Sequence, residues 1–222
     1  MTAFVVACGG PSEPPTAAGS GAPPGVPGTS SRYIVYLHGR IIEDEGLRPT
    51  HPRFGVYEYQ DILDTFDAAG FTVVAPVRPP GADPSEHARV TADEVRRLLD
   101  IGVPAEHITV VGFSKGGAIA VLTAAELGNP HVNFVFIACC SHRITSSVAA
   151  AGGHLTGRML SIYEASDAVG SCSSLFERAA PDSSVAEVEV EIGGGHGAFY
   201  RPHPDWVGPV TRWARGETPN QR

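Results

Sequence analysis

The sequence predicts an α/β protein built on a mainly parallel sheet of about six strands, with helices on both faces. Two observations predict this fold class. From residue 32 onward, short apolar segments of strand length alternate with longer amphipathic segments. Most of the short segments are almost continuously apolar, as expected of parallel strands that are covered on both faces. Strands and helices that alternate at this spacing form parallel crossover units.

Six segments are expected to form the strands. The last of them alternates instead of being uniformly apolar, with Glu187, Glu189 and Glu191 on one side. A row of like charges discourages pairing with another chain, so this segment is expected to be an edge strand. In chain order the six segments are residues 33–37, 71–75, 108–112, 134–138, 159–163 and 185–192.

Four amphipathic segments are expected to form helices. Three of them end at a glycine, which adopts the left-handed conformation that commonly terminates a helix. The last segment should close the chain with Trp206, Val210 and Trp213 facing the core. The four segments are residues 57–69, 84–101, 115–127 and 203–215.

Composition excludes several classes of protein. The 222 residues are 42% hydrophobic and 18% charged, as in a globular domain, and no apolar run approaches the roughly 18–20 residues that span a bilayer. The formal net charge of −8 argues against nucleic acid as a partner. No CxxC, HExxH or paired Cys/His spacing is present, so no metal or other cofactor is expected.

The chain divides at about residue 31. Residues 9–31 are nearly all Gly, Pro, Ser, Thr and Ala, which is typical of a disordered linker. Before them, VVAC at residues 5–8 resembles a bacterial lipobox, with Cys8 as the lipidated residue, although only seven residues precede it. We therefore expect residues 1–31 to be a lipobox-like start and a disordered linker, which would tether a folded domain at 32–222 to a bacterial membrane, outside the cytoplasm, through Cys8. The alternative is a cytoplasmic protein with an ordinary frayed terminus.

Three further cysteines leave two interpretations open. Cys139 and Cys140 are adjacent, and neighbouring residues on a strand point to opposite faces, so at most one of them can reach Cys172. An exported protein would permit a disulfide, for which Cys140 and Cys172 are the candidate pair. The other interpretation is that all three are buried free thiols.

The segment GFSKG at residues 112–116 lies between a predicted strand and a predicted helix. A serine held above the end of a sheet needs a sharp turn whose flanking positions lack side chains, and Gly112 and Gly116 meet that need. The helix that follows directs its free N–H groups toward the same place. Ser114 is therefore the candidate nucleophile, against the alternative of a Gly-Ser-Gly turn without chemistry.

A serine hydroxyl needs a base, and the base needs an orienting group. His196 lies in GGGHG at residues 193–197, directly after the last predicted strand, and Asp167 follows the fifth. Functional groups gather at the carboxyl ends of parallel strands, which brings these two together with Ser114. His203 is the alternative base, and Glu164 and Asp182 are the alternative acids.

Three motifs carry a resemblance to a known family. GFSKGG at residues 112–117 is similar to the nucleophile elbow of carboxylesterases and acyl-thioesterases. LHG at residues 37–39 is similar to their oxyanion strand end, and GGGHG to their histidine loop. From residue 32 to the C-terminus the chain resembles a compact α/β-hydrolase of the serine esterase kind, without a cap domain.

The resemblance implies a role for each candidate residue. Ser114 would be the nucleophile, His196 the base and Asp167 the orienting acid, while the backbone N–H groups of Arg40 and Lys115 would form the oxyanion hole. The sequence departs from the family at Arg40, where many esterases have glycine. It also has no recognisable antiparallel strands before residue 33, so the sheet should be smaller than is usual for the family.

The expected activity is hydrolysis of a small-molecule carboxylic ester or thioester through an acyl-serine intermediate. Two alternatives stay open: a non-catalytic tethered binding protein on the hydrolase fold, and a lyase or C–C hydrolase that uses the same three residues. Residues 41–56 are expected to form a long loop that walls the pocket, or a solvated acidic loop. The Lys115 side chain is expected to lie in solvent or beside an acidic neighbour. The alternative is that it attracts an anionic group of the substrate.

Overall fold

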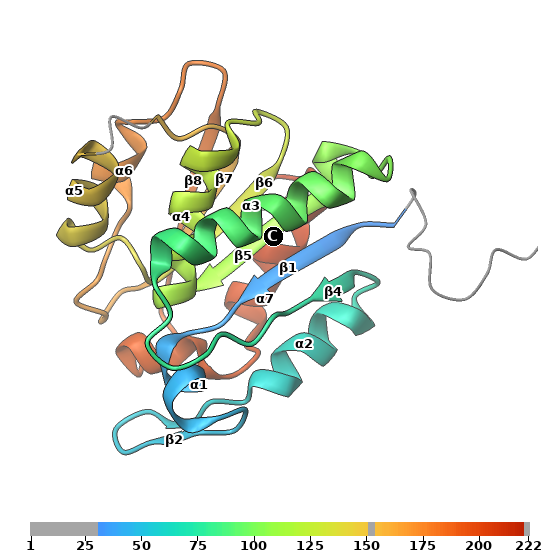
Figure 1. The fold of residues 1–222 in the computed structure, drawn as a ribbon. Coiled ribbons are helices and arrows are strands. Elements are labelled where there is room, and N and C mark those ends of the chain that lie inside the picture. Colours follow the sequence, from blue (N-terminus) through green and yellow to red (C-terminus); the bar gives the residue numbers. More distant parts are fainter. Residues whose placement is uncertain (1–30, 151–153, 220–222) are drawn as a thin grey trace, which may run out of the picture.

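Figure 1 shows a computed structural model of the protein, which describes residues 31–150 and 154–219. Its centre is a six-stranded sheet in the order β4-β1-β5-β6-β7-β8, and every neighbouring pair is parallel. The predicted α/β fold class is confirmed. The strands are β1 (Tyr33–Leu37), β4 (Thr72–Val74), β5 (Ile108–Phe113), β6 (Asn133–Ile137), β7 (Arg158–Glu164) and β8 (Ser184–Val190).

One face of the sheet is covered by α3 (Pro84–Asp100), α4 (Lys115–Leu127), α5 (His142–Ala150) and α6 (Ser173–Phe176). In Figure 1, α3 and α4 cross in front of the strands. The apolar side chains of these helices form one continuous core with the residues of the strands that point toward them. The register of β1 follows the pleat, since Val35 belongs to this core and Tyr36 to the opposite one.

The other face is covered by α1 (Arg40–Glu45), α2 (Tyr59–Ala68), α7 (Pro204–Ala214) and the 3-10 helix η2 (Gly195–Tyr200). Trp206, Val210 and Trp213 of α7 are buried against the sheet, as the sequence predicts. Both faces therefore carry helices, and the strand β8 lies at one edge of the sheet as expected.

Residues 41–56 are not a long loop. They contain most of α1 and an antiparallel hairpin of β2 (Thr50–His51) and β3 (Gly55–Val56). A helix of six residues shows too little periodicity to be recognised in the sequence, and it depends on the burial of Ile42 and Glu43. The short helices α5 and α6 and the 3-10 helix η1 (Ala105–His107) were also not anticipated.

Two of the sequence-based predictions fall on residues that the structure does not describe. Cys8 and residues 9–30 of the expected linker lie outside the described ranges, so the lipid anchor and the domain boundary stay predictions. Within the described ranges, no helix has the length and apolar character needed to cross a membrane.

Candidate active site

Ser114 lies at the junction between β5 and α4, in a backbone conformation that residues other than glycine rarely adopt. Its φ is 55° and its ψ is −117°. Among the described residues, Ser114 and Ala138 are the only ones other than glycine with positive φ. The Ser114 N–H donates a hydrogen bond to the carbonyl of Ile137, at 2.9 Å. Neighbouring strand β6 therefore holds a strained turn that lifts the hydroxyl above the end of the sheet.

The two glycines of GFSKG are required by close backbone contacts. A Cβ on Gly112 would lie 2.2 Å from the carbonyl oxygen of Gly116. A Cβ on Gly116 would lie 1.9 Å from the carbonyl oxygen of Leu37. Helix α4 therefore begins in direct backbone contact with β1 and β5, as the sequence analysis expects of a sharp strand-to-helix turn.

The structure brings Ser114, His196 and Asp167 together in one hydrogen-bonded chain. His196 Nε2 lies 2.9 Å from Ser114 Oγ, and His196 Nδ1 lies 2.7 Å from Asp167 Oδ2. A carboxylate accepts only, so the imidazole proton belongs on Nδ1, which leaves Nε2 free to accept from the serine hydroxyl. The Asp167 side chain is nearly buried and that of His196 is 24% exposed.

Glu164, the first alternative acid, supports this chain without joining it. It closes β7, is buried, and accepts hydrogen bonds from the N–H and hydroxyl of Ser166 and from the N–H of Gly193. Burial alone would raise the pKa of Glu164, but these hydrogen bonds and one from Gly195 hold the pKa below its ordinary value. One carboxylate thus fixes both the turn that carries Asp167 and the loop that carries His196.

The other two alternatives lie elsewhere. Asp182 is exposed in a turn before β8. His203 precedes α7, where its ring nitrogen accepts from the N–H of Asp205, and its side chain is 43% exposed. Neither residue takes the place that Asp167 or His196 occupies beside Ser114.

Two aromatic rings flank the imidazole of His196. The ring centre of Phe113 lies 5.0 Å from that of His196, and the ring centre of Phe54 lies 6.4 Å from it. Phe54 comes from the turn of the β2–β3 hairpin, and a Cβ on Gly197 would lie 2.5 Å from its Cβ. Phe54 could not be predicted as a site residue, because no local pattern links residue 54 to residue 196.

Arg40 and Lys115 occupy equivalent places in the fold. Each is the first residue of a helix, α1 and α4 respectively, where backbone N–H groups have no partner within the helix. Both line a cavity of about 660 Å³ that also contains Ser114 and His196. The side chain of Arg40 is largely exposed and pairs with Asp44 on its own helix.

The cavity has mixed polar and apolar walls. Its floor is Ser114, and one wall is the beginning of α3, with Asp83 and Ser85. Apolar side chains from α4, α5 and the segment before α6 also line it: Ala118, Leu122, Ile144 and Val169. A pocket of this size that combines apolar walls with a few convergent polar groups suits a small organic ligand.

Behind the cavity, a buried carboxylate joins two cations. Glu43 accepts from the Nε of Arg78 at 2.8 Å and from the Nζ of Lys115 at 2.5 Å. Burial alone would raise the pKa of Glu43, but Lys115 and Arg78 hold the pKa below its usual range. The Lys115 side chain therefore meets an acidic neighbour, and Glu43 belongs to a buried ion pair instead of a solvated loop.

His38 completes this buried group. Its Nε2 accepts from the backbone N–H of Arg78 at 3.1 Å, so its proton belongs on Nδ1, which lies 2.9 Å from the carbonyl oxygen of Gly39. The Arg78 guanidinium also donates to the His38 carbonyl. Burial, followed by the charge of Arg78, lowers the pKa of His38 to about 4. His38 is therefore neutral at ordinary pH and anchors the residues between β1 and α1.

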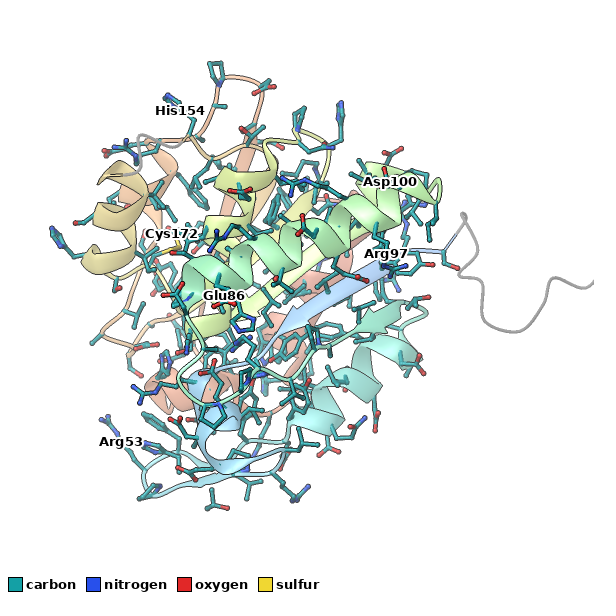
Figure 2. All side chains as sticks on the ribbon, viewed as in Figure 1. Arg53, Glu86, Arg97, Asp100, His154 and Cys172 are labelled. Carbon is teal, nitrogen blue, oxygen red and sulfur yellow. A yellow bond between two sulfur atoms is a disulfide. The ribbon has the colours of Figure 1, made fainter. Side chains whose placement is uncertain are left out.

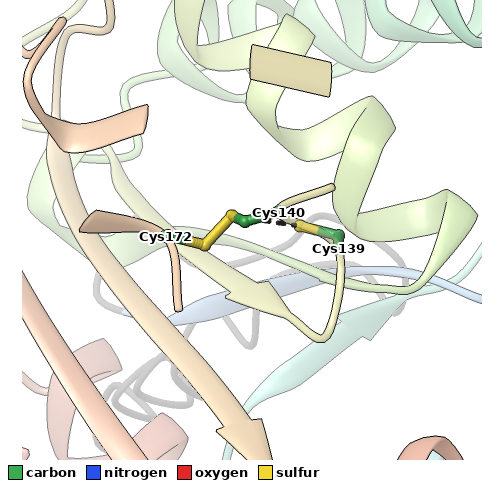
Figure 3. Close-up of side chains that lie close together, drawn as sticks. All are labelled: Cys139, Cys140 and Cys172. Atoms are coloured by element: carbon green, nitrogen blue, oxygen red, sulfur yellow. Dashed lines mark hydrogen bonds between the residues drawn. A yellow bond between two sulfur atoms is a disulfide. The ribbon is translucent and has the colours of Figure 1, made fainter. Parts of the chain in front are cut away.

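Figure 3 shows the three cysteines around the end of β6. Cys140 and Cys172 form a disulfide, and Cys139 is a buried thiol whose Sγ lies 3.9 Å from that of Cys140. Burial raises the pKa of Cys139 to about 12. The three sulfur atoms lie within 4.8 Å of one another, but the disulfide leaves only one thiol to bind a metal.

No known protein-family profile matches this sequence, and no curated protein matches it. Several solved structures share its fold at low sequence identity. Arabidopsis thaliana SOBER1 is 12% identical with a TM-score of 0.54, over 84% of this chain and 99% of that one. A putative dienelactone hydrolase from Klebsiella pneumoniae is 18% identical with a TM-score of 0.53, over 83% and 87%. An acetyl xylan esterase from Paenibacillus is 14% identical with a TM-score of 0.54, over 85% and 75%.

Proposed function

We propose that this chain, which has the α/β-hydrolase fold, is a serine hydrolase that cleaves carboxylic esters or thioesters through an acyl-Ser114 intermediate. The observation that carries the proposal is the hydrogen-bonded chain from Ser114 through His196 to Asp167, at the floor of a cavity. A nucleophile, its base and the group that orients the base are the parts that acyl transfer requires.

In the first half-reaction, Ser114 Oγ attacks the ester carbonyl carbon while His196 Nε2 takes the hydroxyl proton. Asp167 stabilises the imidazolium that forms and holds its ring in place. The carbonyl oxygen becomes an oxyanion, which the backbone N–H groups of Arg40 and Lys115 would bind. His196 then gives its proton to the leaving alcohol or thiol, and the acyl group stays on Ser114.

In the second half-reaction, a water molecule replaces the alcohol. His196 Nε2 takes a proton from this water, whose oxygen attacks the acyl carbon and forms a second oxyanion in the same place. Collapse of that intermediate returns the proton to Ser114 Oγ and releases the carboxylic acid. The step needs no group beyond those of the first half-reaction.

The names of the structural neighbours favour an ester as the substrate. An acetyl xylan esterase and a dienelactone hydrolase are each named for an ester or lactone bond. The apolar walls at Leu122, Ile144 and Val169 suit an acyl or alcohol group of modest size. The neighbours and the walls together support an ester bond as the bond that is cleaved.

We also propose that the protein works outside the cytoplasm, anchored through Cys8. The disulfide between Cys140 and Cys172 supports this location, because such bonds persist in oxidising compartments. Fractionation of the producing cell tests the proposal. Protein in the membrane fraction that moves to the soluble fraction on Cys8→Ser is the expected result, and wild-type protein in the cytosol would overturn it.

A panel of p-nitrophenyl esters, thioesters and lactones tests the activity. We expect short esters to be hydrolysed with an initial burst of about one product per protein, and Ser114→Ala to abolish both burst and turnover. Tight binding without turnover would instead support the non-catalytic alternative. Cleavage of a C–C bond without ester hydrolysis would support a lyase or C–C hydrolase.

A further inference from the structure

Glu43 links the two helices that carry the expected oxyanion donors. It belongs to α1, three residues after Arg40, and its carboxylate accepts from the side chain of Lys115, the first residue of α4. Its second oxygen accepts from the Nε of Arg78. Arg78 in turn donates to His38, two residues before α1: its guanidinium donates to the His38 carbonyl oxygen and its backbone N–H to His38 Nε2. The Glu43 side chain is wholly buried.

Helix α1 has few other means of fixing its first residue. It has only six residues, and Gly39 at its N-cap makes no side-chain capping bond. The Arg40 side chain extends into solvent, so it gives its own backbone little support. Of the α1 side chains, Ile42 and Glu43 are the buried ones. The position of the Arg40 N–H relative to that of Lys115 therefore depends on the contact between Glu43 and Lys115, together with the hydrogen bonds that hold His38 and Gly39.

We propose that the Glu43–Lys115 ion pair is a positioning element that sets the spacing of the two oxyanion donors. The inference rests on the proposed hydrolase function and deepens it. A donor displaced by a fraction of an ångström binds the oxyanion less well, while the apolar walls that hold the ground-state substrate stay in place. Loss of the ion pair should therefore lower kcat and leave KM nearly unchanged.

Glu43, Arg78 and Lys115 also give this region a net positive charge. The effect of this charge on kcat must be separated from the effect of positioning. With His38 neutral, Glu43, Arg78 and Lys115 sum to +1. Lys115→Met removes both the contact and one positive charge. The double variant Glu43→Gln with Lys115→Met also removes the contact, but it leaves only the charge of Arg78 and so restores +1. A positioning role predicts a low kcat in both variants.

The experiment measures kcat and KM for a short p-nitrophenyl ester in four variants whose folding is checked by circular dichroism. We expect kcat to fall about 10- to 100-fold in Lys115→Met and in the double variant, since a whole oxyanion donor is worth about 10²–10³. KM should change by less than about threefold. Lys115→Arg keeps a cation within reach of Glu43 and should restore most of kcat.

Glu94→Gln is the matched control. Glu94 also accepts two hydrogen bonds from an arginine, Arg97, but on the exposed side of α3. Figure 2 shows Arg97 near the end of α3 that lies away from Glu86 and the cavity. This variant should have wild-type kcat and KM.

The outcomes separate this inference from the proposed function. Wild-type kcat in both Lys115→Met and the double variant overturns the inference while leaving the hydrolase assignment intact. A double variant that recovers full kcat also overturns it, because net charge alone would then explain the effect. If wild-type protein turns over no ester, thioester or lactone, the proposed function fails first and the inference with it.

Discussion

The carbonyl oxygen of Leu37 occupies the space that a side chain on Gly116 would need. A Cβ on Gly116 would lie only 1.9 Å from that oxygen, which is well inside any allowed contact. Leu37 ends β1 and Gly116 is the second residue of α4, so the contact joins the segment that leads to Arg40 with the segment that follows Ser114. The obstacle is the backbone of Leu37, which cannot move aside as a flexible side chain could.

Gly116→Ala should therefore prevent formation of the native turn. We expect a loss of more than about 4 kcal/mol in the free energy of unfolding, a large part of the about 5–15 kcal/mol of a typical domain. Gly128→Ala is the control, because Gly128 ends α4 with a φ of 60° and open space around it. That change should cost about 1–2 kcal/mol. Urea unfolding measures both, and equal losses would contradict the contact.

Asp167→Asn should reduce turnover by about 10³–10⁴-fold without unfolding the protein, because an amide in this position favours the wrong tautomer of His196. The Asp167 carboxylate lies 2.7 Å from the ring nitrogen. Steady-state kinetics on a short ester measures the effect. Asp182→Asn changes an exposed carboxylate and should leave kcat unaltered. A large loss in Asp182→Asn and none in Asp167→Asn would reverse the assignment.

Much of the fold could be predicted from the sequence because it depends on local patterns. The apolar runs at residues 33–37 and 108–112 became β1 and β5, and the helix expected at 115–127 has those bounds. Glycine and proline residues indicated where the turns lie. Helix α1 was missed because six residues give no periodic signal, and its stability comes from tertiary burial.

Some residues of the site could likewise be predicted from the sequence, and others could not. Ser114, His196 and Asp167 each follow a strand, so parallel topology alone brings them to the carboxyl ends of the strands, on the same side of the molecule. The partnership of Glu43 with Arg78 has no such signal. The two residues lie 35 positions apart, Glu43 in a helix too short to give a periodic signal and Arg78 in a segment without regular structure. Only the fold reveals that the carboxylate is buried between two cations.

Stability should fall as the pH is lowered from about 6.5 to about 4, in part because of His38. Its pKa is lowered to about 4 in the folded protein, from 6.5. In that window the unfolded chain binds a proton that the folded chain does not, so acid favours unfolding. The contribution is fully present above pH 6.5 and amounts to about 3 kcal/mol, on the scale of 1.36 kcal/mol for each pH unit.

His38→Gln isolates this effect, since a glutamine oxygen can accept from the N–H of Arg78 and does not titrate. The free energy of unfolding of both proteins is measured in urea at several pH values. The difference between them should change with pH between about 6.5 and 4 and be constant above. A constant difference throughout that window would show that His38 is not held neutral.

Reduction of the disulfide between Cys140 and Cys172 should destabilise the protein by about 3–4 kcal/mol. The bond closes a loop of 32 residues, and its loss restores the corresponding entropy to the unfolded chain. Thermal unfolding with and without a thiol reductant measures the loss. Cys139→Ser changes the buried thiol that does not form a disulfide and should keep the sensitivity to reductant, while Cys140→Ser should abolish it. Identical melting of wild-type protein in both conditions would contradict the prediction.

Covalent labelling with a fluorophosphonate is the sharpest test of the acyl-serine mechanism, because it requires both an activated serine and an oxyanion site. Intact mass and peptide mapping identify the labelled residue. We expect one phosphonyl group per protein, located on Ser114, with labelling strongly slowed in His196→Ala and absent in Ser114→Ala. Folded wild-type protein that takes no label, or that carries it on another residue, would contradict the assignment of Ser114 as the nucleophile.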